Sequence, residues 1–110
     1  MDSVTVRVLH NQNESQSFDV GYRHGDPLIE VYEGKHRFPY KDPEALELSL
    51  EQIFEQNQWA EKGSVHPWYP DARSLSVGDV IVLHHKAYAC ERVGFREINP
   101  VDAGIEELIA

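Results

Sequence analysis

Two stretches in the first third of the chain have the residue pattern of β-strands. In VTVRVL (Val4 to Leu9), hydrophobic and polar residues alternate, so Val4, Val6 and Val8 face one side of a half-buried strand. LIEVYEG (Leu28 to Gly34) is rich in β-forming residues and predicts a second strand. The polar, glycine- and proline-containing residues between them predict an irregular connection or a short edge strand.

A third strand-like region is hydrophobic on both faces. Val80 to Leu83 is followed, after HHK, by a return strand from Ala87 to Val93. A hairpin that is apolar on both sides belongs at the centre of a sheet. The turn contains no glycine, so it requires a residue that tolerates the left-handed backbone conformation, and His84 and His85 are among the more tolerant types.

The clearest helix is predicted over residues 43 to 57. Asp42 is placed to cap its N-terminus, Pro43 occupies the first helical position, and Glu44 lies near the positive end of the helix dipole. The hydrophobic stripe consists of Leu46, Leu50, Ile53 and Phe54, followed by Asn57. The opposite, solvated face carries Glu47, Glu51 and Glu55.

The C-terminal tail, residues 99 to 110, has a weaker helical pattern. Val101, Ile105, Leu108 and Ile109 follow the spacing of a short amphipathic helix that would dock on the domain. If Leu108 and Ile109 were exposed instead, they would favour a homodimer through the tail.

These elements predict one domain spanning residues 1 to 110, with an α+β fold. We expect a small, mostly antiparallel sheet of four or five strands with the 43 to 57 helix packed on one face. A partly open β-barrel with one packed helix is a variant of the same prediction.

The charge and the cysteine content limit which partners and which cellular compartment we expect. Ten Lys and Arg against nineteen Asp and Glu give a net charge of −9, which disfavours direct binding to nucleic acid. The single cysteine, Cys90, excludes an internal disulfide. We expect Cys90 to be a packed structural residue. Its apolar setting raises the thiol pKa and so reduces the fraction of reactive thiolate. The N-terminus resembles neither a signal peptide nor a membrane span, so we expect a cytoplasmic protein that does not bind membranes.

Residues 46 to 98 resemble the YodL-like domain family. That family's pattern is a helix ending in Asn, a Ser-Leu-Ser-Val-Ser-Asp-Val segment, and a return strand with Tyr-Cys-x-x-x-Gly-Phe. The matching residues are Leu50, Phe54, Asn57, Ser74, Leu75, Ser76, Val77, Asp79, Val80, Cys90, Gly94 and Phe95. The chain departs at Gly78, where the family more often has Ser, and in its short HHK turn. The resemblance implies an accessory module of a phage, plasmid or other mobile element, and implies no catalytic residue.

Hydroxyl and carboxylate residues before the third strand-like region could suggest catalysis. Ser76 and Asp79 could meet His66 and Asp71 in a cleft and form a small enzyme or ligand-binding site. However, the sequence has no Gly-x-Ser-x-Gly elbow, and such residues at the start of a strand usually bond their own backbone. The histidines lack the spacing of metal ligands, so no metal and no cofactor is expected.

The segment VHPWYPD is the strongest candidate for a partner-binding surface. Prolines brace Trp68 and Tyr69, and His66 and Asp71 flank them, which would present a rigid aromatic contact. In the alternative arrangement, the loop folds its aromatic residues back over the sheet and enlarges a small core.

The sequence therefore favours a non-enzymatic protein-interaction module, acting on a host or mobile-element protein through the Trp68 loop and an acidic surface. One alternative is a DNA mimic or anti-restriction inhibitor, whose acidic face would imitate a phosphate path. The other alternative is the small enzyme or ligand-binding domain described above.

Overall fold

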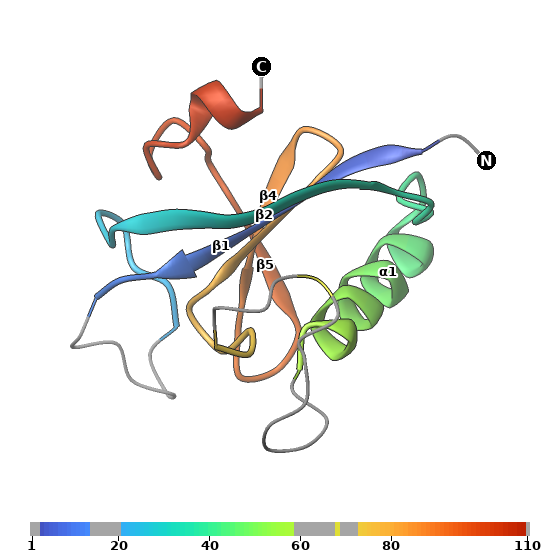
Figure 1. Cartoon of the computed structure of the whole chain (residues 1–110), viewed down its shortest axis with the longest axis horizontal. Helices are drawn as coiled ribbons and strands as arrows, with labels where there is room; N and C mark the ends of the chain where they lie inside the picture. Colours follow the sequence, from blue (N-terminus) through green and yellow to red (C-terminus); the bar gives the residue numbers. More distant parts are fainter. Residues whose placement is uncertain (1–2, 14–20, 59–67, 69–72, 110) are drawn as a thin grey trace.

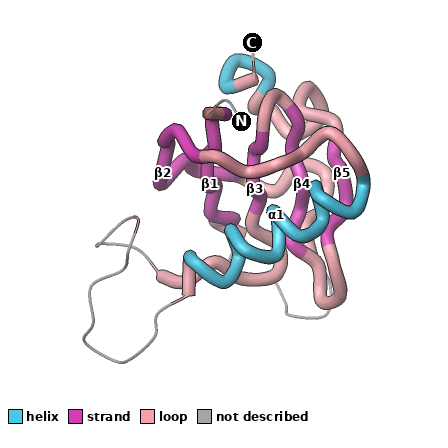
Figure 2. Tube along the Cα trace, turned by 90° about the vertical axis from the view of Figure 1, so that its right-hand side faces the viewer, coloured by secondary structure: helices cyan, strands magenta, loops and turns pink. Residues whose placement is uncertain are grey.

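The computed structural model describes residues 3–13, 21–58, 68 and 73–109, and it contains one five-stranded sheet. The strands are β1 (Val4–Asn11), β2 (Leu28–His36), β3 (Val80–Leu83), β4 (Lys86–Cys90) and β5 (Phe95–Ile98). Figure 1 shows the strands along the chain, and Figure 2 shows their order across the sheet, β2-β1-β3-β4-β5. Every neighbouring pair is antiparallel. One α-helix, α1 (Pro43–Gln56), and one short 3₁₀ helix, η1 (Glu106–Leu108), complete the described fold.

The predicted α+β class is confirmed, with α1 lying across one face of the sheet (Figure 2). The sheet is open rather than barrel-like, because β2 and β5 form its two edges. The hairpin of β3 and β4 lies near the centre, as its two-sided hydrophobicity predicts, and all four residues of β3 are buried.

Helix α1 begins where its capping residues predict. The Asp42 side chain accepts a hydrogen bond from the backbone N–H of Ala45 at 2.9 Å, and Pro43 opens the helix. The helix ends at Gln56, and the buried Asn57 caps it with its side-chain amide bonded to the carbonyl of Ile53 at 2.6 Å. No helix in the described part of the chain is long and apolar enough to cross a membrane.

The sheet has a hydrophobic core on each face. On the helix side, Leu50 and Ile53 of α1 pack with Val4, Val6 and Val8, the residues that the alternating pattern assigns to one side. On the other side, a second cluster gathers the alternate residues of the central strands with the C-terminal segment. This cluster contains Leu9, Tyr22, Val80, Val82, Ala87, Ala89, Ile98 and Ile105. Burial on both faces explains why β3 and β4 carry almost no polar residues.

The β3–β4 turn uses two histidines in the left-handed conformation, as predicted. His84 has φ +45° and His85 has φ +68°. Positive φ at both central residues is the geometry of a two-residue type I′ hairpin, which matches the twist of the flanking strands.

The prediction that one return strand runs from Ala87 to Val93 is wrong. β4 ends at Cys90, and residues 91 to 94 form a turn closed by a hydrogen bond from the Glu91 N–H to the Gly94 carbonyl at 3.1 Å. Gly94 has φ +76°, which other residues rarely adopt, and it reverses the chain into β5.

The C-terminal tail docks on its own domain, but its predicted helix is reduced to the single 3₁₀ turn of η1. Gly104, at φ +73°, interrupts the helical path and leaves Val101 exposed. Ile105 is buried, while Leu108 and Ile109 pack partly buried against the same cluster. The two residues whose exposure would favour a homodimer are thus in contact with their own sheet.

Candidate functional site

Three of the four predicted partner-binding residues, His66, Tyr69 and Asp71, lie outside the described residues. Trp68 is described and is half-buried. Its ring stacks on His36 of β2, with ring centroids 4.4 Å apart, and contacts Tyr32 at 4.8 Å. For Trp68 the structure therefore shows the alternative arrangement, in which the aromatic ring lies back over the sheet.

The Trp68 ring covers a polar pair on β2. The Tyr32 hydroxyl and His36 Nε2 are 2.7 Å apart and share a hydrogen bond. Burial lowers the pKa of His36 and raises the pKa of Tyr32, since each charged form would lose hydration. The cluster packs against the helix-side core and so has a structural role in closing the edge at β2.

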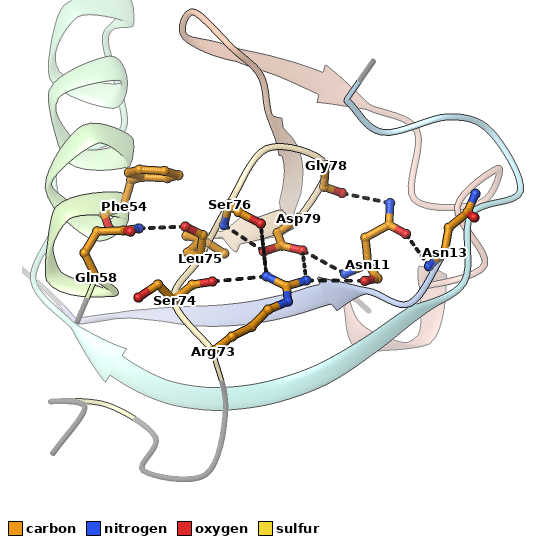
Figure 3. A network of polar contacts seen from close by, with 10 residues as sticks. All are labelled: Asn11, Asn13, Phe54, Gln58, Arg73, Ser74, Leu75, Ser76, Gly78 and Asp79. Atoms are coloured by element: carbon orange, nitrogen blue, oxygen red, sulfur yellow. Dashed lines mark hydrogen bonds and ion pairs between the residues drawn. The ribbon is translucent and has the colours of Figure 1, made fainter. Parts of the chain in front are cut away.

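Asp79, just before β3, is the centre of a buried polar network (Figure 3). Arg73 donates to both of its carboxylate oxygens, at 2.6 and 2.7 Å. The backbone N–H groups of Asn11 and Ser76 donate to the same carboxylate, each at 2.8 Å. The side chain of Asp79 is fully buried, and these four hydrogen bonds together compensate its charge for the loss of water.

The network continues from Asn11 to a second buried carboxylate. The Asn11 amide donates to Asp26 at 2.9 Å and to the Gly78 carbonyl at 3.0 Å, and Asn13 donates to Asp26 at 2.6 Å. Burial raises the pKa of Asp26, but the hydrogen bonds from Asn11, Asn13 and the Arg23 backbone outweigh it and lower the pKa overall. These contacts fasten the end of β1 to the turn before β3.

Of the four residues in the alternative enzyme site, only Ser76 and Asp79 are described, and they do contact each other. The Ser76 backbone N–H bonds to Asp79, as expected for a turn that satisfies its own backbone. The Asp79 carboxylate is buried and accepts hydrogen bonds from Arg73 and two backbone N–H groups. Its role is therefore to stabilise the turn.

The described histidines do not converge on a metal site. His84 stacks on Tyr40 with centroids 4.1 Å apart, and His85 Nδ1 lies 2.9 Å from the Ile109 carbonyl oxygen. Within the described ranges, no group of three or more His, Cys, Asp and Glu residues is arranged to hold a metal ion.

A groove of about 640 Å³ lies between the C-terminal half of α1 and the β4–β5 turn. Its apolar lining comes from Phe54 on α1, Leu75 and Val77 before β3, Cys90 at the end of β4 and Phe95 on β5. The rings of Phe54 and Phe95 meet edge to face, with centroids 6.5 Å apart. The volume falls within the range of ordinary ligand pockets.

Hydrogen bonds to backbone carbonyls fix the walls of the groove in place. The Gln58 side chain donates to the Leu75 carbonyl at 2.7 Å, and the Leu75 N–H donates to the Asn57 carbonyl at 3.1 Å. On the other wall, the Gly78 N–H donates to the Cys90 carbonyl at 2.8 Å. The Asp79 network therefore fixes the same turn that shapes the groove.

Acidic residues line the rim of the groove on both walls. Glu51 and Glu55 are exposed on α1, and Glu91 lies on the β4–β5 turn. Glu91 pairs with Arg96 at 3.0 Å, whereas Glu51 and Glu55 form no ion pair with any described residue. Among the described residues, the groove carboxylates without an ion pair are thus those of the helix wall.

Cys90 is a packed side chain beneath the groove rather than a reactive thiol within it. It is 1% exposed, and burial, with the charge of Asp79, raises its pKa well above the ordinary value. A thiol that stays protonated at neutral pH is a poor nucleophile and a poor metal ligand. This agrees with the prediction of a packed structural cysteine.

Sequence reasoning missed the groove, although one signal pointed to it. Seven residues that carry the YodL-like resemblance line it: Phe54, Leu75, Ser76, Val77, Cys90, Gly94 and Phe95. Residues that are scattered over three segments of the sequence therefore meet in one place.

Comparisons with protein-family models, curated proteins and solved structures found no match to this chain. The YodL-like resemblance gains no support from them and stays a prediction. The functional argument therefore depends on the geometry alone.

Proposed function

We propose that this chain is a non-enzymatic protein-interaction module that receives a segment of a partner protein in the groove between α1 and the β4–β5 turn. The observation that carries the proposal is the pair of half-buried aromatic rings, Phe54 and Phe95, that line a concave, mainly apolar site of about 640 Å³. Aromatic residues in a concave site are the usual anchors of binding energy in protein recognition.

The chemistry of the described residues also supports binding over catalysis. The titratable groups that line the groove are the carboxylates of Glu51, Glu55 and Glu91, the guanidinium of Arg92 and the Cys90 thiol, whose pKa is raised by burial. The buried carboxylate nearest to it, Asp79, is occupied by Arg73 and two backbone N–H groups. If the YodL-like resemblance holds, the partner would be a protein of the host or of the mobile element.

The test is selection of peptides from a random phage-displayed library against the intact protein. Enriched peptides are then titrated against the Phe95→Ala variant, which removes one wall of the groove. The matched control is Val93→Ala, because Val93 is 89% exposed on the same turn and does not line the groove. We expect Phe95→Ala to weaken binding at least tenfold and Val93→Ala to leave it unchanged.

Phe95→Ala could lose binding because it misfolds, so a fluorophore on the groove rim provides a second test that keeps Phe95. Arg92→Cys puts a reactive thiol at the exposed rim on the β4–β5 turn, and Glu44→Cys puts one at the far end of α1, while buried Cys90 stays unlabelled. A selected peptide should change the emission of the Arg92→Cys label and not that of the Glu44→Cys label. Peptides that change neither, or a library that yields no binders, would refute the proposal.

A further inference from the structure

The acidic row on α1 assigns a chemical class to the segment that binds in the groove. Glu47, Glu51 and Glu55 follow one another at intervals of four residues, so their carboxylates lie along one face of the helix. None of the three forms an ion pair with a described residue, and all three are exposed. Two of them, Glu51 and Glu55, belong to the groove wall.

This row is unfavourable for the helix that carries it. Like charges four residues apart repel each other, and Glu55 lies in the last turn, where the helix dipole disfavours negative charge. The last turn of α1 contains no basic residue to offset it. A cation supplied by a partner would relieve both effects.

The two walls of the groove differ in the charge that they offer. On the β4–β5 side, Glu91 is paired with Arg96, and Arg92 also lines the wall. On the α1 side, the carboxylates of Glu51 and Glu55 form no ion pair with the part of the chain that the structure describes. The groove therefore has an apolar floor, a β4–β5 wall that carries no net negative charge, and an acidic wall on α1.

Resting on the function proposed above, we infer that the occupant is a basic amphipathic segment of a partner protein. Its apolar side chain packs on Phe54 and Phe95, and its lysine or arginine lies against Glu51 and Glu55. The net charge of −9 attracts such a segment from a distance, and the row sets its orientation in the groove.

The experiment uses the peptides selected from the phage library, sequenced and titrated at low salt against two doubly neutralised variants. Glu51→Gln with Glu55→Gln removes the charges of the helix wall. Glu106→Gln with Glu107→Gln is the matched control, because it removes two exposed charges from η1, which contributes no residue to the groove. Both variants change the net charge equally, so any difference between them is local.

We expect the selected peptides to share an apolar residue close to lysine or arginine. The helix-wall variant should weaken their binding about tenfold and the control less than twofold. In about 1 M salt, where charges are screened beyond about 3 Å, the difference should disappear.

Each other outcome overturns a different claim. Neutral or acidic peptides that still need Phe95 would refute the basic segment and leave the interaction module standing. Equal losses in the two variants would indicate a diffuse acidic field, as in a DNA mimic, and would refute a cation bound at this wall. Peptides that bind independently of Phe95 would refute the proposed function itself.

Discussion

Replacing Asp79 with alanine should destabilise the protein more than any other single polar substitution in the Arg73 network. The Asp79 side chain is fully buried and accepts hydrogen bonds from the backbone N–H groups of Asn11 and Ser76 as well as from Arg73. Removal of the carboxylate leaves two backbone donors without their acceptor, in a site that joins β1 to the turn before β3.

The magnitude follows from the groups left unpaired. Each buried N–H without an acceptor costs about 1–3 kcal/mol. The Arg73 pair adds less than a fully buried one, because the Arg73 side chain is 47% exposed and becomes hydrated when Asp79 is lost. We expect Asp79→Ala to lower the free energy of unfolding by about 3–5 kcal/mol, a large part of the roughly 5–15 kcal/mol typical of a domain.

Arg73→Ala is the informative comparison. It leaves the Asp79 charge bonded to two backbone N–H groups, and water can enter from the exposed side, so we expect a loss of about 1–2 kcal/mol. The double variant should cost little more than Asp79→Ala alone, because the shortest contacts of Arg73 are to the carboxylate that is already gone. The other hydrogen bonds of Arg73, to the Ser74 and Asn11 carbonyls and the Ser76 hydroxyl, are longer, and those to the two serines are exposed.

Urea unfolding followed by circular dichroism measures these differences, provided that the denaturant slope is unchanged. Glu106→Ala serves as the control, since an exposed substitution should stay within about 0.5 kcal/mol. A loss below about 1 kcal/mol for Asp79→Ala, or additive losses in the double variant, would refute the network as a unit that fixes the turn.

Three other predictions concern single groups. Burial lowers the pKa of His36 in the folded state, so as the pH falls the unfolded chain binds a proton at a higher pH than the folded protein does. The free energy of unfolding should therefore fall as the pH drops below about 6.5, and it should fall less in His36→Phe. Urea unfolding at two pH values measures both. Cys90 should react with a thiol reagent at pH 8 only in denaturant, and a fast reaction of the folded protein would contradict its burial. The double substitution of His84→Asn with His85→Gly should raise the free energy of unfolding by roughly 1 kcal/mol, because Asn-Gly suits the left-handed turn; a loss in urea unfolding would show that the stack on Tyr40 matters more.

The local parts of the fold could be predicted from the sequence because their causes are local. Alternation in β1, two-sided hydrophobicity in β3 and β4, and the Asp42-Pro43 start of α1 are properties of adjacent residues. β5 was not predicted as a separate strand, because its four residues carry little hydrophobic pattern and its start depends on the turn at Gly94.

The polar network and the groove could not be predicted because their causes are long-range. Asn11 and Asp79 are 68 positions apart, and no spacing in the sequence relates a strand end to a later turn. The groove requires Phe54 of α1, Leu75 of the segment before β3 and Phe95 of β5 to meet in space. Sequence reasoning chose the Trp68 loop because its aromatic residues are adjacent, whereas the aromatic pair of the groove is brought together only by folding.

The acidic row of α1 was predicted as a solvated face, and its exposure is as expected, but exposure does not decide whether the row has a function. Stability does help to decide. Neutralising Glu51 and Glu55 relieves like-charge repulsion and an unfavourable dipole contact, so the free energy of unfolding should rise by about 0.5–1 kcal/mol while peptide binding weakens. If the row serves only solubility, the free energy of unfolding should rise and peptide binding should stay unchanged. A rise in the free energy of unfolding together with weaker peptide binding would show that α1 is less stable than it could be because its carboxylates serve recognition.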